Sequence, residues 1–178
     1  MLASVERLKK ILMIPNSDVS QDEELSILLT TASEIIEKRC GRKFEIQEYI
    51  EKHSGTDWDH LFTKNYPITN VDYVKMTEEE VNDYEIMPEE GILFRDSCWE
   101  RGQRNIEIKY TAGYEDNIPK SLEQACLFLA KVIYTEEWGK ASERIGNQYS
   151  VTFIQGESND LPPVVLALIG PYIGRAVR

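Results

Sequence analysis

The residues of this chain that could carry out chemistry are its two histidines, its three cysteines and its many carboxylates. His53 and His60 are separated by a short segment that contains Asp57 and Asp59. Imidazole and carboxylate groups are common metal ligands, so these four side chains could hold a metal ion. Their spacing matches no established ligand pattern, however, and the segment from His53 to Asp59 predicts a turn. We therefore expect exposed turn histidines and no metal site.

Nucleophilic chemistry is not indicated either. The cysteines Cys40, Cys98 and Cys126 lie far apart and form no C-x-x-C pair, so the sequence signals neither a disulfide framework nor a zinc site. Cys40 and Cys126 occupy apolar helical positions, where a free thiol behaves as a small hydrophobe. The motifs G-x-S-x-G and H-E-x-x-H and the glycine-rich phosphate loops are absent. We expect no catalytic residues and no cofactor, although the abundant carboxylates leave open a hydrolase that uses an acid pair.

The net charge of −11 arises from one segment of the chain. Residues 45–100 contain four Lys or Arg against fifteen Asp or Glu, whereas the residues before and after them are balanced. We define an acidic face that contains no basic residue: Glu78, Glu79, Glu80, Asp83, Glu85, Glu89 and Glu90. This face is either a solvated surface or a wall that DNA passes without adhering, because proteins that grip DNA neutralise its phosphates.

The chain also contains one compact cluster of basic residues. It consists of Arg39, Arg42 and Lys43, at the end of a predicted helix. Positive side chains are favourable there because the carboxyl end of a helix carries partial negative charge. The cluster is therefore interpreted as dipole compensation with solvation, or as a basic surface for a partner.

Two amphipathic helices frame the acidic segment. The first has an apolar stripe with helical spacing and ends at Gly41, a residue suited to the left-handed position after a helix. The second opens at Ile118-Pro119 and is expected to end near Trp138-Gly139. The two stripes consist of Leu25, Leu28, Leu29, Ala32, Ile35 and Ile36, and of Leu122, Ala125, Cys126, Leu129 and Ile133. Their mutual burial predicts the structural core. A shorter helix, capped by Ser4, precedes them.

The segment between the helices predicts short strands joined by tight turns. The strands are expected at residues 60–62, 71–76, 84–87, 92–94 and 105–112. The fold class is therefore α+β, a bundle of about four helices with an inserted antiparallel module of five or six strands. We expect a single domain over residues 1–178, with a helical body at 1–44 and 115–178 and the β module at 45–114.

The carboxyl-terminal region predicts a contact surface. Tyr149, Val151 and Phe153 alternate with polar residues as in a strand, yet a lone strand leaves its backbone groups unpaired. It either returns to the sheet or adds to an edge of another subunit. Pro162-Pro163 suit the first turn of a terminal helix, in which Val165 and Leu168 are further candidate interface residues. The apolar run of this helix is too short to cross a membrane.

Several segments together resemble the head-tail connector, or head-completion adaptor, proteins of tailed phages. The order of these pieces is more specific than any one of them, and the β module matches most loosely. The matching segments are Leu28 to Glu37, Cys40 to Phe44, Tyr66 to Val71, Ile108 to Tyr114 with Ile118-Pro119, Ser150 to Phe153, and Leu161 to Val164 with Leu168.

The resemblance implies a structural protein without catalysis or cofactor. It further implies that the members of this family form a ring of self-associated subunits, commonly of about twelve copies, between the portal protein and the next neck or tail-completion protein. DNA passes through such a ring as cargo and is not bound specifically. We therefore expect a virion neck location after assembly in the host cytoplasm, and no membrane partner. A prophage-encoded protein-binding module remains an alternative, as does the hydrolase.

Overall fold

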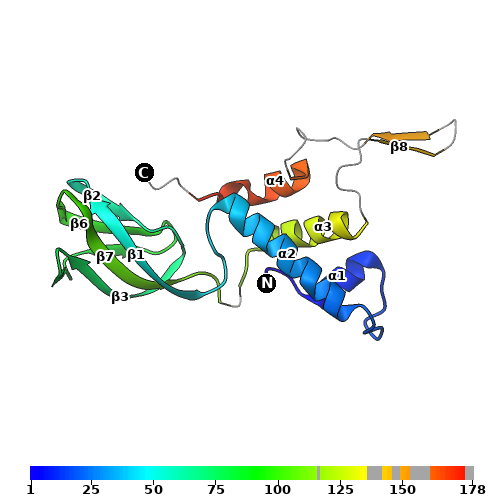
Figure 1. The fold of residues 1–178 in the computed structure, drawn as a ribbon, viewed down its shortest axis with the longest axis horizontal. Coiled ribbons are helices and arrows are strands. Elements are labelled where there is room, and N and C mark those ends of the chain that lie inside the picture. Colours follow the sequence, from blue (N-terminus) through cyan, green and yellow to red (C-terminus); the bar gives the residue numbers. More distant parts are fainter. Residues whose placement is uncertain (116, 136–141, 146–148, 153–160, 175–178) are drawn as a thin grey trace. The chain divides into compact units, whose positions relative to one another are not determined.

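The chain divides into two compact units in a computed structural model (Figure 1). The model describes residues 1–115, 117–135, 142–145, 149–152 and 161–174. The helical unit consists of Met1–Cys40 and Ile118–Ile173, and the β unit contains Gly41–Asn117. The expected α+β class is confirmed. The single-domain organisation, with boundaries at 45 and 114, stays a prediction.

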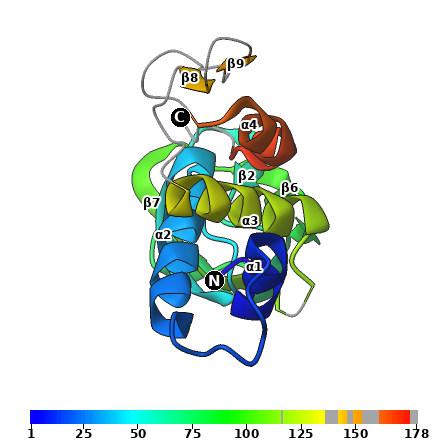
Figure 2. The same cartoon turned by 90° about the vertical axis from the view of Figure 1, so that its right-hand side faces the viewer.

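The helical unit contains four α-helices and a short 3₁₀ helix among its described residues (Figure 2). They are α1 (Val5–Leu12), α2 (Asp22–Cys40), α3 (Lys120–Tyr134), α4 (Pro163–Ile169) and η1 (Gly170–Tyr172). Helix α3 contacts α1, α2 and α4, so it is the central element of this unit. It ends before the predicted Trp138-Gly139, and residues 136–141 lie outside the described residues.

The predicted core between α2 and α3 is confirmed. Its fully buried side chains are Leu25, Leu29, Ala32 and Ile36 of α2 and Leu122, Ala125, Cys126 and Leu129 of α3. Cys40 and Cys126 are buried free thiols, as expected. Gly41 has a φ of 73°, the left-handed conformation that ends α2. Ser33 ties the amino terminus to this core, because its hydroxyl accepts a 3.0 Å hydrogen bond from Leu2 N and donates one of 2.7 Å to Leu29 O.

The β unit contains two antiparallel sheets. The four-stranded sheet has the order β1-β7-β3-β4 and the three-stranded sheet the order β2-β6-β5. The strands are β1 (Gln47–Gly55), β2 (Trp58–Phe62), β3 (Ile68–Met76), β4 (Glu79–Glu80), β5 (Glu85–Met87), β6 (Ile92–Trp99) and β7 (Gly102–Ala112). Strand β7 lies between β1 and β3, so the unit is not a simple meander of sequential strands.

The β unit has its own hydrophobic core. The buried residues of this core are Leu61, Ile68, Val74, Leu93, Trp99, Ile106, Ile108, Tyr110 and Ala112. Alternation along β7 produces it, because Ile106, Ile108 and Tyr110 point inward while Glu107 and Lys109 point outward. The charged residues Glu107 and Lys109 of β7 consequently lie on the outer face of the four-stranded sheet.

The strand predicted around Tyr149 is not alone. Strand β9 (Tyr149–Thr152) pairs antiparallel with β8 (Ser142–Ile145), with Ile145 opposite Tyr149. Among the described residues it does not return to the main sheets, because the preceding residues supply a partner strand. Its addition to an edge of another subunit stays a prediction. Strand β8 was not predicted, because its residues Ser142, Glu143 and Arg144 carry no clear strand signal.

Candidate functional site

The acidic face lies on the β unit, in and around β4 and β5. All of its carboxylate residues are exposed. Glu80 of β4 lies opposite Lys75 of β3. Asp83 accepts hydrogen bonds of 2.9 Å from Arg95 Nε and from the Ser97 hydroxyl, and these bonds hold the pKa of its carboxyl below the ordinary value. Basic side chains from neighbouring strands therefore offset part of the charge of a segment that has none of its own.

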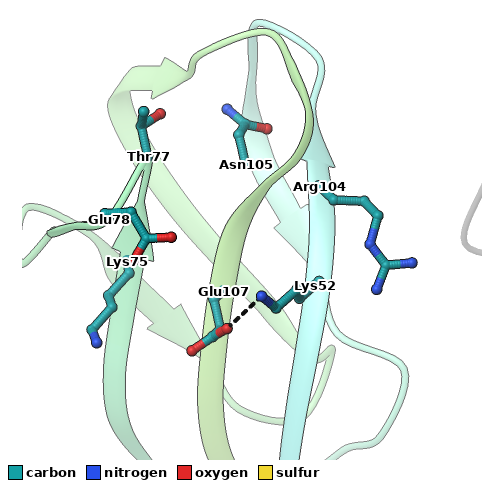
Figure 3. Close-up of a pocket in the computed structure, with 7 residues that line it drawn as sticks. All are labelled: Lys52, Lys75, Thr77, Glu78, Arg104, Asn105 and Glu107. Atoms are coloured by element: carbon teal, nitrogen blue, oxygen red, sulfur yellow. Dashed lines mark ion pairs between the residues drawn. The ribbon is translucent and has the colours of Figure 1, made fainter.

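A small hollow on the four-stranded sheet combines charges of both signs (Figure 3). Its volume is about 180 Å³, and its lining residues are Lys52, Lys75, Thr77, Glu78, Arg104, Asn105 and Glu107. Glu107 lies opposite both Lys52 and Lys75 in the strand register, and Lys52 Nζ is 3.0 Å from Glu107 Oε2. Figure 3 shows Lys75 and Arg104 extending to opposite sides of Glu107. Because the cations do not converge, the hollow is a row of cross-strand pairs rather than a cradle for phosphate.

The two histidines lie on strands, so the predicted turn from His53 to Asp59 was wrong. His53 belongs to β1, and its Nε2 is 2.9 Å from Glu51 of the same strand. His60 belongs to β2, and its Nδ1 is hydrogen-bonded to Asp59. The turn is shorter than expected because β1 extends to Gly55 and β2 begins at Trp58. Among the described residues, no three His, Cys, Asp or Glu side chains gather where they could hold a metal ion.

Glu51 is a largely buried carboxylate of the β unit. Burial opposes its charge, but hydrogen bonds from His53, from the Tyr110 hydroxyl and from Lys64 N outweigh burial and lower its pKa. Burial and the neighbouring Glu51 raise the pKa of Tyr110. A general acid would instead need a raised carboxyl pKa. In the described part of the chain, every carboxyl with a clear pKa departure is shifted downward, which gives an acid-pair hydrolase no support.

Arg42 has a structural role that the sequence did not reveal. Its side chain is only 4% exposed, and its guanidinium carbon lies 3.5 Å from the centroid of the Tyr66 ring. Nη1 also donates a 2.9 Å hydrogen bond to Tyr66 O. The interpretation of Arg42 as a solvated or partner-facing charge was therefore wrong, since the guanidinium packs inside the β unit on an aromatic partner far away in sequence.

The predicted interface residues lie in different surroundings. Val165 is fully buried in the helical unit, whereas Leu168 is partly exposed. Tyr149 and Val151 belong to β9, and Phe153 lies outside the described residues. Residues 161–174 contain no charged side chain. The outward side of this segment carries Val164, which is 47% exposed, and Ile173, which is 46% exposed. Contact between the predicted interface residues and a neighbouring subunit stays a prediction.

No described helix is long and apolar enough to cross a membrane. The family model of the head completion proteins matches residues 1–174. The chain belongs to the head completion protein family. This match confirms the resemblance to head-completion adaptors. By sequence, no curated protein matches this head completion protein.

Solved structures with a similar fold come from gene transfer agent (GTA) particles. A chain in the neck of an empty GTA particle, computed with C6 symmetry, matches with a TM-score of 0.64 and 20% identity over 98% of this chain and 89% of the other. One in the neck of a native GTA particle, computed with C12 symmetry, matches with a TM-score of 0.57 and 20% identity over 89% and 85%. A third, in a native GTA virion, has a TM-score of 0.56 and 19% identity over 93% and 84%.

Proposed function

We propose that this head completion protein is a structural component of the virion neck. It self-associates into a ring, of about twelve copies, between the portal and the next neck or tail-completion protein. Double-stranded DNA passes through the ring during packaging, retention and ejection. The observation that carries the proposal is family membership over almost the whole chain, together with a fold similar to chains from necks computed with C6 and C12 symmetry.

The helical unit offers a surface suited to subunit contact. The exposed side of α4 and η1 contains Val164, Leu168 and Ile173 and no charged residue. An uncharged apolar surface gains free energy when a neighbouring subunit removes it from water. A ring requires a head-to-tail contact, so this surface docks on a different surface of the next copy.

The β8–β9 hairpin is the second proposed contact element. A two-stranded ribbon is marginally stable by itself in water and gains stability from a covering or pairing partner. We propose that this hairpin, with Tyr149 and Val151, and the following residue Phe153 contact a neighbouring subunit or the portal. Strand addition or packing along the ribbon would satisfy its open edges.

The acidic face suits a conduit for DNA. Exposed carboxylates repel phosphates, so a wall of this kind lets a duplex slide without adhering. The pairing of Asp83 with Arg95 leaves the remaining carboxylates of the face in excess, which keeps the surface anionic. No cofactor, metal or catalytic residue enters this function.

Deletion of Arg144 to Asn159 tests the proposed assembly. With the ends joined by a short glycine-serine linker, the variant should remain folded, because the core between α2 and α3 lies elsewhere. We expect it to sediment as a monomer with the portal protein present, whereas the intact chain forms rings. If the deletion variant formed rings as the intact chain does, this result would contradict a role for the hairpin in assembly.

A further inference from the structure

The outer face of the three-stranded sheet carries an aromatic and apolar strip. His60 of β2 lies opposite Phe94 of β6, which lies opposite Glu85 of β5. Directly paired residues share a face, and the neighbouring row on this face contains Phe62, Ile92 and Met87. The His60 ring centroid is 5.2 Å from that of Phe94 and 6.3 Å from that of Phe62. The opposite face holds Leu61 and Leu93 of the core, whereas on the strip Ile92 is buried and Met87 is 37% exposed.

Trp58 extends the apolar strip toward solvent. Its side chain is 65% exposed, more than that of any other described aromatic residue. Trp58 and Phe94 line a common hollow of about 440 Å³, together with Asp57, Asp59, Asp96 and Cys98. The hollow is therefore lined by Trp58 and by three acidic residues. Glu85 adds a further carboxylate to the same sheet face.

The backbone beside Trp58 is held by a dense set of hydrogen bonds. Asp57, with a φ of 61°, donates from its backbone N to Trp99 O at 2.9 Å and accepts at its Oδ1 from Arg101 N at 2.9 Å. Gly55 allows its backbone to approach that of Glu100 closely, because a Cβ at Gly55 would lie 1.8 Å from Glu100 O. The exposed indole is thus presented on a fixed support, which lowers the entropic cost of binding.

We propose that this face docks a basic and apolar segment of another protein, with an arginine or lysine over the Trp58 ring and apolar side chains along the strip. Cations bind the faces of indole rings, and the surrounding carboxylates would pair with the same charge. A second copy in the same orientation is disfavoured, because it would bring two sets of carboxylates together. Nucleic acid is disfavoured for the same reason. The proposal does not depend on the proposed contact between subunits of the neck ring, which uses the helical unit.

Fluorescence anisotropy with two labelled peptides tests this proposal on the full-length protein. The probe is the hexapeptide Leu-Arg-Leu-Arg-Leu-Arg, and its counterpart has glutamate in place of arginine. We expect saturable binding of the arginine peptide only. Trp58→Ser should weaken this binding about tenfold, and Asp96→Asn should weaken it severalfold with a reduced salt dependence.

Two matched variants test whether peptide binding depends on this face, or on any exposed apolar or acidic side chain. Ile50→Ser removes an apolar side chain of similar exposure, 63%, from β1 of the other sheet, and Glu79→Gln removes a carboxylate from β4. Both should bind the arginine peptide within about twofold of the intact protein. Equal losses in Trp58→Ser and Ile50→Ser would overturn the proposal. So would a fall in oligomer mass of Trp58→Ser without peptide, since that result assigns the face to a second copy.

Discussion

The Arg42 guanidinium carbon lies 3.5 Å from the centre of the Tyr66 ring, and its Nη1 donates to the Tyr66 carbonyl oxygen. One side chain thereby joins the segment that follows α2 to the segment between β2 and β3. The planar guanidinium stacks and donates at the same time, which a lysine ammonium cannot do. The Cys40-Gly41-Arg42 segment therefore has a structural reason to contain arginine.

Arg42→Lys should destabilise the protein by about 1–2 kcal/mol, because it removes the stack and leaves Tyr66 O without this donor. Urea unfolding followed by tryptophan fluorescence measures the change, since Trp99 is buried in the same unit. Arg101→Lys is the matched control at an exposed position and should change the free energy of unfolding by less than about 0.5 kcal/mol. Equal effects of the two substitutions would contradict the role assigned to Arg42.

Glu51→Gln should change how stability depends on pH. Because the folded-state pKa of Glu51 is lowered from 4.5, its charge adds stability above that value, and this contribution is lost as the pH falls through the folded pKa. Near neutral pH, the free energy of unfolding of the intact protein should exceed that of Glu51→Gln by about 1–3 kcal/mol. The difference should shrink below pH 4.5, because the Glu51 carboxyl of the unfolded chain takes up its proton there while that of the folded protein stays ionised to lower pH. Urea titrations at a series of pH values measure it, and a constant difference would argue against an ionised Glu51.

Three glycines should tolerate alanine in a defined order. At Gly113, which has a φ of 122°, a Cβ would lie 2.5 Å from Glu45 O, so Gly113→Ala should cost more than about 2 kcal/mol. Gly41 has open space but a φ of 73°, so Gly41→Ala should cost about 1–2 kcal/mol. Gly170 has open space and helical φ, so Gly170→Ala should be neutral or slightly stabilising. Thermal unfolding ranks the three, and any other order would contradict the backbone geometry described.

Adjacent valines of α4 separate folding from assembly. Val165 is buried, so Val165→Asp places an unpaired charge in the core and should unfold the helical unit, at a cost of about 3 kcal/mol or more. Val164 is half exposed, so Val164→Asp should leave circular dichroism and the melting temperature nearly unchanged while it reduces oligomer mass. Sedimentation velocity and circular dichroism on the same samples distinguish the two. A Val164→Asp protein that assembles normally would exclude this side of α4 from the contact.

The helices could be predicted because their information is local. The stripe from Leu25 to Ile36, Gly41 after α2 and the prolines before α3 and α4 each act through neighbours within one or two turns. The approximate positions of β2, β3, β5, β6 and β7 followed from alternation in the same way, but the described β unit has seven strands where five or six were expected. Strand β1 was not among the expected strands, because His53 and Ser54 resemble a turn by composition, whereas the register of His53 opposite Ile106 of β7 holds His53 in the sheet.

The parts of the candidate surfaces that could not be predicted depend on contacts between distant residues. Nothing near Arg42 in the chain indicates Tyr66, and nothing near Asp83 indicates Arg95. The strip that contains His60 and Phe94 exists only because β2 and β6 pair in one register. A shift by one residue would have turned it into the core.

Electron microscopy of the purified protein mixed with its portal protein shows whether the protein forms the proposed neck ring. We expect a closed ring of this protein on the portal, with rotational symmetry and an open channel wide enough for a DNA duplex. The Val164→Asp protein, folded and at the same concentration, should leave the portal bare. Portals that carry isolated copies of the intact protein, or none, would contradict the proposed neck ring.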